Sequence, residues 1–278
     1  MSPIYFDEPI VSANSGPGGW ADATHVPSDE LKERFMWWNN ELIAMEHCGV
    51  EFDENDKPIN PYAPSDPRLG RHMLGKWGPN HAADPIITRD GRYSFSPKEI
   101  LVVKRKPQKD VPDDKLFALP GGFVEAGEEF KTAALREAFE EAVEKDVELK
   151  ELFDRNAVRV YTGYVEDPRC TRNAWIETCT FHLHLTHEQG GRLSVKHQGD
   201  GEETTGAFWA PLVSQTFDSM YSHHPLRVKE ACVVKGWIVP ETCFTHYAEQ
   251  AMETFYNVKT LILMASILVA FTSFKSIK

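Results

Sequence analysis

Hydrophobic and polar positions follow a strand-like pattern in several short stretches of the chain. Runs rich in Val, Ile, Thr and aromatic residues, often alternating with polar ones, favour β-strands because such side chains fit a pleated, half-buried surface. The predicted strands are 86–88, 99–106 (EILVVKRK), 115–119, 158–165 (VRVYTGYV), 175–185 (WIETCTFHLHL) and 207–209. Asp90-Gly91 predicts a hairpin turn. His182 and His184 fall on one face of their strand, which we expect to be a solvent-facing edge.

Other stretches have apolar residues three and four positions apart, the spacing of an amphipathic helix. Ser28 is expected to cap such a helix, with a packing stripe on one side formed by Leu31, Phe35, Trp38 and Leu42. Further helices are predicted at 129–143 and 226–236, and a helical or irregular link at 149–153.

The segment 68–89 contains glycines at 70, 75 and 78, which predict tight turns ahead of the strand at 86–88. Such turns would hold four polar or aromatic side chains at defined angles: Trp77, Asn80, His81 and Asp84. The segment is interpreted either as an ordered loop that covers the core or as a binding loop.

Composition places the chain among ordinary globular proteins, with 41% hydrophobic and 26% charged residues in 278. The formal net charge of -12 argues against non-specific nucleic-acid binding, so no nucleic-acid partner is expected. Five scattered cysteines without a CxxC pair suit reduced thiols, and the first residues lack a secretory pattern, so we expect a cytoplasmic protein. No pattern indicates an oligomeric state.

The apolar segment 260–274, TLILMASILVAFTSF, has fifteen residues. A helix needs roughly 20 to cross a bilayer. We therefore expect a buried or partner-bound helix here, and keep a short membrane anchor as the alternative.

The stretch 121–141, GGFVEAGEEFKTAALREAFEE, carries the candidate chemistry. On a helix from 129 to 143, three carboxylates share one face, opposite a mostly apolar face that can pack on a sheet. The three are Glu137, Glu140 and Glu141, and the apolar face is Ala134, Leu135, Ala138, Phe139 and Ala142.

Crowded carboxylates repel one another unless a hard cation such as Mg²⁺ sits among them, so these three are candidate metal ligands. Arg136 is placed to pair with Glu140 or with Glu128 and to fix the carboxylates. The backbone at Gly121 can approach an ion closely, and its carbonyl is a fourth candidate ligand. The alternative is a solvated acidic helix.

The spacing of Gly122, Glu128, Arg136-Glu137 and Glu140-Glu141 resembles the Nudix box, the signature of the Nudix hydrolase family. The chain departs from the usual box at Val143 and Glu144, beyond the carboxylates. The resemblance implies an α/β/α sandwich with a mixed sheet. It also implies Mg²⁺- or Mn²⁺-dependent hydrolysis of a nucleoside diphosphate linked to another group.

Three further motifs, 75–85, 163–169 and 173–178, resemble the ADP-ribose pyrophosphatase subfamily and the related domain of ADP-ribose-gated TRPM channels. The resemblance implies ADP-ribose as the substrate. It implies substrate contacts at Asn80, Asp167, Arg169, Tyr221 and His224. Tyr221 or Trp77 could stack on adenine. The expected division of the chain is an extension or cap contributing to substrate binding at 1–97, a catalytic domain at 98–240 and a tail at 241–278.

The expected reaction converts ADP-ribose and water to AMP and ribose 5-phosphate. Glu137, Glu140 and Glu141 would hold the metal, and Arg136 and Glu128 would support them. The sequence leaves the general base open among Glu140, Glu177, Glu202 and Glu203. Two other functions stay open: a sensor that binds ADP-ribose without hydrolysing it, and a Nudix enzyme for another diphosphate.

Overall fold

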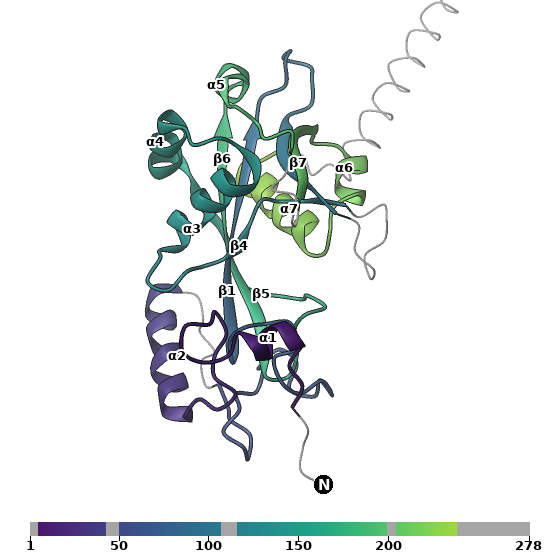
Figure 1. The fold of residues 1–278 in the computed structure, drawn as a ribbon. Coiled ribbons are helices and arrows are strands. Elements are labelled where there is room, and N and C mark those ends of the chain that lie inside the picture. Colours follow the sequence, from purple (N-terminus) through teal and green to yellow (C-terminus); the bar gives the residue numbers. More distant parts are fainter. Residues whose placement is uncertain (1–4, 43–49, 107–115, 199–203, 238–278) are drawn as a thin grey trace, which may run out of the picture.

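The computed structural model describes residues 5–42, 50–106, 116–198 and 204–237, without the side chains of 36–42. Within them, seven strands form one mixed sheet (Figure 1). The strands are β1 Gly78–Arg89, β2 Glu99–Arg105, β3 Phe117–Ala118, β4 Gly122–Phe123, β5 Val158–Val165, β6 Ala174–Leu185 and β7 Thr204–Pro211. The helices are α1 Pro9–Ala13, α2 Ser28–Leu42, α3 Phe130–Glu137, the π-helix η1 Ala138–Ala142, α4 Val147–Asn156, α5 His187–Arg192, α6 Ser214–Asp218 and α7 His224–Val234.

The long strands β1 and β6 form the centre of the sheet, in the order β3-β2-β1-β6-β5. They pair in parallel along their whole lengths, from Gly78 opposite Ala174 to Arg89 opposite Leu185. All other strand pairs are antiparallel: β2 and β4 pair with β1, β3 and β7 pair with β2, and β5 pairs with β6. The predicted mixed sheet is confirmed.

Helices cover both faces of the sheet (Figure 1). Leu101 and Val103 of β2 point to a core shared with α3, η1 and α4, while Ile100 and Val102 point to a core shared with α6 and α7. This alternation follows from the two-residue period of a strand buried on both faces. The predicted α/β/α sandwich is therefore confirmed. The helix predicted at 129–143, called here the box helix, corresponds to α3 and η1. Its predicted apolar face is confirmed, since Ala134, Ala138 and Ala142 are fully buried in the core that α3, η1 and α4 share with β2.

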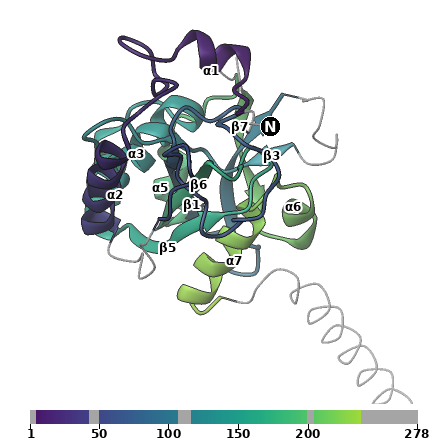
Figure 2. The same cartoon turned by 90° about the horizontal axis from the view of Figure 1, so that it is seen from below.

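The N-terminal part of the described chain packs around the first residues of β1 and the last residues of β5 (Figures 1 and 2). Leu31 and Phe35 of α2 are buried against Trp77, which confirms the first half of the predicted packing stripe. The side chains of Trp38 and Leu42 lie outside the described part of the chain. Arg71 is fully buried and forms an ion pair of 2.6 Å with Asp7. A buried arginine needs such a partner, because its charge cannot be removed. The ion pair thereby joins the first described residues to the segment that leads into β1.

The sequence predicted a turn-rich loop up to residue 85, and this was wrong for 78–85, which belong to β1. The prediction rested on the glycines at 70, 75 and 78, but the strand begins at Gly78 and contains Pro79 and Pro85, which lack the N–H that a strand donates. The amides of Gly78 and Asp90 donate towards β6. Even-numbered residues of β1 therefore face β6 with their N–H, and odd-numbered residues face the opposite edge of the strand. Pro79 and Pro85 are odd-numbered, so the N–H that each lacks would point away from β6. There β1 pairs only briefly with β4 and β2, and the prolines are tolerated.

Two other predictions need correction. His182 is buried rather than solvent-facing, because Trp237, just after α7, packs 5.4 Å from its ring and 4.8 Å from that of His184. The box helix is not a uniform α-helix, since its second half is the π-helix η1. The other predicted strands and the helix at 226–236 are confirmed within a few residues. β1 and β2 pair antiparallel as a hairpin, but residues 90–98 connect them and the turn lies at 94–95 rather than at Asp90-Gly91. The undecided link at 149–153 lies in α4.

The predicted division at residue 98 stays a prediction, although the sheet itself begins at Gly78. The apolar segment 260–274 lies outside the described residues. In the described ranges, no helix combines the length and the apolar character needed to span a bilayer. Cys170 and Cys179 are buried free thiols, and Cys232 is buried as well.

Candidate active site

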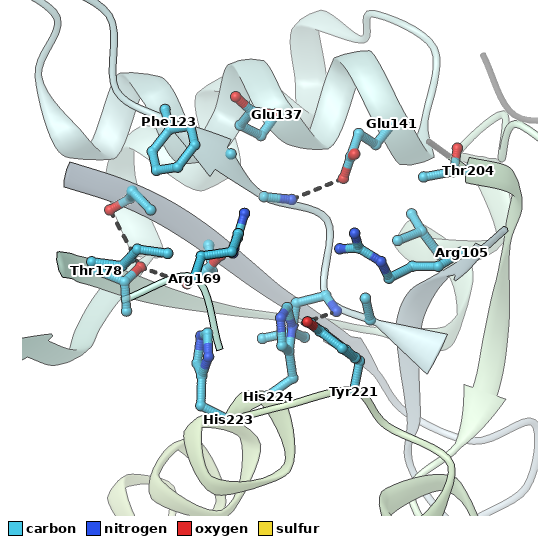
Figure 3. Close-up of a pocket in the computed structure, with 18 of the residues that line it drawn as sticks. Arg105, Phe123, Glu137, Glu141, Arg169, Thr178, Thr204, Tyr221, His223 and His224 are labelled. Atoms are coloured by element: carbon cyan, nitrogen blue, oxygen red, sulfur yellow. Dashed lines mark hydrogen bonds between the residues drawn. The ribbon is translucent and has the colours of Figure 1, made fainter. Parts of the chain in front are cut away.

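A cavity of about 850 Å³ opens between the box helix, the sheet and the start of α7 (Figure 3). Its size suits a ligand as large as a nucleotide. Side chains reach it from the sheet, the β3–β4 loop, α3 and η1, the segment after β5, and the segment leading into α7. The polar and aromatic residues of its lining include Asp84, Arg105, Phe123, Glu137, Glu140, Glu141, Arg169, Thr178, Thr204, Tyr221, His223 and His224.

The loop between β3 and β4 runs directly against the acidic helix. The amide of Gly121 donates a hydrogen bond of 2.9 Å to the carboxylate of Glu141. At Gly122, an added Cβ would lie 2.5 Å from Oε1 of Glu137. At Gly121, an added Cβ would collide with the carboxylate of Asp84. The two glycines are therefore needed for the backbone to approach three acidic side chains.

Arg136 connects the acidic side chains from behind the cavity. Its guanidinium donates to Glu128 through Nε and Nη2, both at 2.9 Å, and through Nη1 to Glu137 at 2.7 Å and Glu140 at 2.9 Å. Both pairings expected from the sequence are present. The hydrogen bonds of Arg136 lower the pKa of Glu128 and keep it ionised. Arg136 thus fixes the rotamers of the carboxylates that face the cavity.

Asp84, Glu137, Glu140 and Glu141 form one side of the cavity, called here the acidic wall. Burial sets the ionisation of its carboxylates. Desolvation raises the pKa of Glu137 to about 7, although the charge and hydrogen bond of Arg136 oppose this. Desolvation also raises the pKa of Asp84 to about 6, despite a 2.5 Å hydrogen bond from the hydroxyl of Thr178. Glu140, in contrast, keeps about half of its side chain exposed. A cation placed here would favour the ionised form of each buried carboxylate.

The donor set fits a hard divalent cation in kind, because carboxylate and carbonyl oxygens are the ligands that Mg²⁺ prefers. Within the described ranges, however, no three acidic, histidine or cysteine side chains are already grouped to hold an ion. The three carboxylates instead have protein partners: Arg136 donates to Glu137 and Glu140, and the amide of Gly121 donates to Glu141. Binding a metal would require some of these partners to be exchanged.

The opposite part of the cavity presents nitrogen donors and aromatic rings. Asp167 is buried and accepts two hydrogen bonds from the guanidinium of Arg169, at 2.8 and 3.0 Å. Burial raises the pKa of Asp167, but the hydrogen bonds and charge of Arg169 outweigh it and hold the pKa below its ordinary value. Asp167 therefore orients Arg169, which lines the cavity, and is not itself part of the lining.

His224 is also fixed by the loop that precedes the box. Its Nδ1 accepts a hydrogen bond of 2.8 Å from the amide of Leu119, so the ring proton is on Nε2. Burial, and the positive charges around it, hold the pKa of His224 well below its ordinary value, and the ring is neutral. Tyr221 and His224 both line the cavity, as expected from the sequence.

Two residues expected at the ligand lie elsewhere. The side chain of Asn80 is buried and hydrogen-bonds the main chain of Lys76 and Gly78, away from the cavity lining. Trp77 is buried in the N-terminal core, so it cannot stack on adenine as suggested.

Among the candidate bases, Glu177 is buried and does not line the cavity. Trp175 Nε1 donates to its Oε1 at 2.8 Å, and His81 Nε2 lies 3.4 Å from its Oε2 without a hydrogen bond. Glu202 and Glu203 lie outside the described residues. Glu140 is the candidate that faces the cavity.

The sequence did not identify Arg105, Phe123, Thr178 or His223 as site residues, and it gave Asp84 no role in the acidic wall. Thr178 and Asp84 are 94 positions apart and meet only because β1 and β6 pair in parallel. No local pattern could have indicated this contact. His223 is adjacent to the predicted His224, and its Nε2 is buried without a hydrogen-bond partner among the described atoms.

Comparison with known proteins adds an independent line of evidence. The family model described as the NUDIX domain matches residues 80–220. The mitochondrial ADP-ribose pyrophosphatase of Rattus norvegicus is 33% identical, over 79% of this chain and 65% of its own length. The putative nudix hydrolase 6 of Caenorhabditis elegans is 35% identical, over 64% of each protein.

A channel protein is similar as well. The transient receptor potential cation channel subfamily M member 2 of Rattus norvegicus is 34% identical over 68% of this chain, but over only 12% of its own length. The chain thus spans slightly less than two thirds of the two hydrolase relatives, and a small part of the channel.

Proposed function

The chain belongs to the NUDIX family, and from this premise we propose that it hydrolyses the diphosphate bond of ADP-ribose, giving AMP and ribose 5-phosphate. The observation that carries the proposal is the pairing of two walls in one cavity. Glu137, Glu140 and Glu141 face it from the box helix, while Arg169 and Tyr221 face it from the segments that flank the sheet. One wall suits a metal ion and the other suits an anionic nucleotide.

Glu137, Glu140, Glu141 and the carbonyl of Gly121 would hold Mg²⁺ or Mn²⁺. A bound divalent cation supplies neutralisation of the diphosphate and a lowered pKa of water. The protein residues provide positioning. Arg169, oriented by Asp167, offers a directional fork to a phosphate or to ribose hydroxyls, and His224 can donate from Nε2. Such positioning and electrostatic stabilisation account for most of the catalysis in phosphoryl transfer.

The sensor alternative is less well supported by the acidic wall. Arg136, Glu137, Glu140 and Glu141 are all present; Arg136 donates to Glu137 and Glu140, and the amide of Gly121 donates to Glu141. A module that only binds ADP-ribose does not need this set. The similarity to the channel protein is the reason to test the sensor alternative. A sensor would bind ADP-ribose tightly without releasing AMP.

Residues 1–97 are proposed to contribute to substrate binding, followed by a catalytic domain at 98–240 and a tail at 241–278. Glu8, His72 and Met73 support the first part, because they lie in the cavity lining although they precede the sheet. A cytoplasmic location and the absence of a nucleic-acid partner also stay proposals. The name of the rat relative places that protein in mitochondria.

A substrate panel tests the proposed function. ADP-ribose, dinucleoside polyphosphates, oxidised nucleoside triphosphates and capped RNA are compared by kcat/KM with the full chain and Mg²⁺. We expect ADP-ribose to have the highest value. A higher value for any other diphosphate would show a Nudix enzyme of different specificity and would contradict the proposal.

A further inference from the structure

Arg105 lies at the end of β2 inside the cavity, and the proposed function gives it no role. The backbone around it is irregular: Lys104 pairs with Gly206 and Arg105 pairs with Thr204, so one residue of β7 is left over. Such a bulge bends a strand and redirects its side chains, and bulges are common beside active sites. The amide of Arg105 remains fixed by a 2.8 Å hydrogen bond to the carbonyl of Leu116.

The guanidinium of Arg105 rests on an aromatic ring. It lies 4.9 Å from the ring centroid of Tyr221, whose own amide donates to the carbonyl of Phe117 at 2.7 Å. Tyr221 therefore acts as a fixed support for the guanidinium rather than as an open surface on that side. The Nε of Arg105 is buried and has no hydrogen-bond partner among the described atoms. A buried donor without an acceptor costs free energy, and arginine cannot lose its charge to reduce that cost.

The other two guanidinium groups at the site have carboxylate partners. Arg136 binds Glu128, Glu137 and Glu140, and Arg169 binds Asp167. Arg105 forms no ion pair with any described residue. Figure 3 shows Arg105 and Arg169 entering the cavity from different elements, on the same side of the carboxylates of Glu137 and Glu141. The fork of Arg105 is thus available to a ligand that reaches this part of the cavity.

We infer that Arg105 binds phosphate oxygens of a nucleoside diphosphate, as a second guanidinium beside Arg169. A diphosphate entering this cavity meets the carboxylates of Glu137, Glu140 and Glu141, which repel it. Two guanidinium groups offset that repulsion, and the planar fork of arginine matches two phosphate oxygens at once. The inference rests on the proposed function in one respect, namely that a diphosphate occupies the cavity.

Binding of α,β-methylene-ADP and of adenosine tests the inference, measured by titration calorimetry with the full chain in Mg²⁺. The methylene bridge resists hydrolysis, so binding is separated from turnover. Arg105→Gln should weaken binding of the analogue by about tenfold or more, the size expected for a charge-assisted hydrogen-bonded contact. Binding of adenosine should change less than about twofold, since the contact is to phosphate. Arg105→Lys should restore part of the loss, because lysine keeps the charge but not the fork.

Arg155→Gln is the matched control, because it removes one positive charge from the exposed side of α4. Thermal melting of each variant checks that the fold is kept. Unchanged binding of the analogue by Arg105→Gln would overturn the inference, as would an equal loss for adenosine or no binding by the wild type. The wild type could instead bind the analogue through Arg105 without hydrolysing ADP-ribose. In that case the proposed function fails and the inference stands.

Discussion

The amide of Gly121 donates a 2.9 Å hydrogen bond to the carboxylate of Glu141, and this bond joins the loop before the box to the π-helical turn. Arg136 holds Glu137 and Glu140 from the other side. The three glutamates are therefore positioned from two places: the backbone of the β3–β4 loop and the side chain of Arg136 on α3. π-Helical turns are frequent at functional sites, and here the turn carries two of the three proposed metal ligands.

Glu141→Gln should abolish most turnover and leave the fold intact. The glutamine carbonyl can still accept from the amide of Gly121, but a neutral amide ligates Mg²⁺ poorly. We expect kcat for ADP-ribose to fall by roughly 10²-fold or more, measured as AMP release. Glu144→Gln, an exposed neighbour beyond the box, is the control and should keep its activity. Activity within a few-fold of the wild type in Glu141→Gln would argue against the metal assignment.

Gly122→Ala should disturb the acidic wall through sterics alone. The new Cβ would lie 2.5 Å from Oε1 of Glu137, so the carboxylate has to move. Misplacement of a catalytic group by about 1 Å can cost up to about 10²-fold, and we expect kcat to fall by about tenfold to that limit. Gly191→Ala adds the same atom in open space on α5 and should be neutral. Equal activity of the two variants would show that the close approach of Gly122 is unimportant.

Asp167→Asn should affect substrate binding more than chemistry. Arg169 would lose its only described ion-pair partner, and an amide cannot hold both Nε and Nη2 as a carboxylate does. We expect KM for ADP-ribose to rise by about tenfold, with a smaller change in kcat. Asp154→Asn removes a surface carboxylate that pairs with Lys150 and serves as the comparison. A fall in kcat at constant KM would assign Asp167 to the reaction itself.

His182 makes stability depend on pH. Burial lowers the pKa of its ring to about 3 in the folded protein, and nearby Lys235 and His184 act in the same direction. The unfolded chain, with an ordinary pKa near about 6.5, binds the proton first as pH falls. The contribution is therefore complete above about pH 6.5 and is lost between that value and about pH 3, with about 2 kcal/mol lost by pH 5.

Urea denaturation at pH 7 and pH 5 measures this effect. The free energy of unfolding of the wild type should fall over this interval. In His182→Gln the fall should be smaller by about 2 kcal/mol, because glutamine does not titrate. The buried His223, whose pKa burial lowers to about 4, still titrates in both proteins. The same pH dependence in both would show that His182 is not the group responsible.

Local spacing was sufficient to predict the box and its supporting arginine. The pairing of Arg136 with Glu128 and Glu140 spans at most eight residues, and one helix with its preceding loop brings these side chains together. The strands β2, β5 and β6 were predicted for the same reason, since each carries a continuous pattern of its own.

Contacts between distant segments could not be predicted. The tolerance of Pro85 in β1 depends on which side of the strand is left unpaired. Burial of His182 depends on Trp237, 55 positions further along the chain. The hydrogen bond between Asp84 and Thr178 depends on the parallel register of β1 and β6. In each case tertiary packing, rather than local propensity, decides the outcome.

Hydrolysis of ADP-ribose by the full chain is the most direct test of the central claim. With Mg²⁺ present, we expect AMP and ribose 5-phosphate in equal amounts, and no products once EDTA has removed the metal. ADP-ribose that binds to the protein but remains intact in Mg²⁺ or Mn²⁺, or products that form equally well in EDTA, would contradict the account.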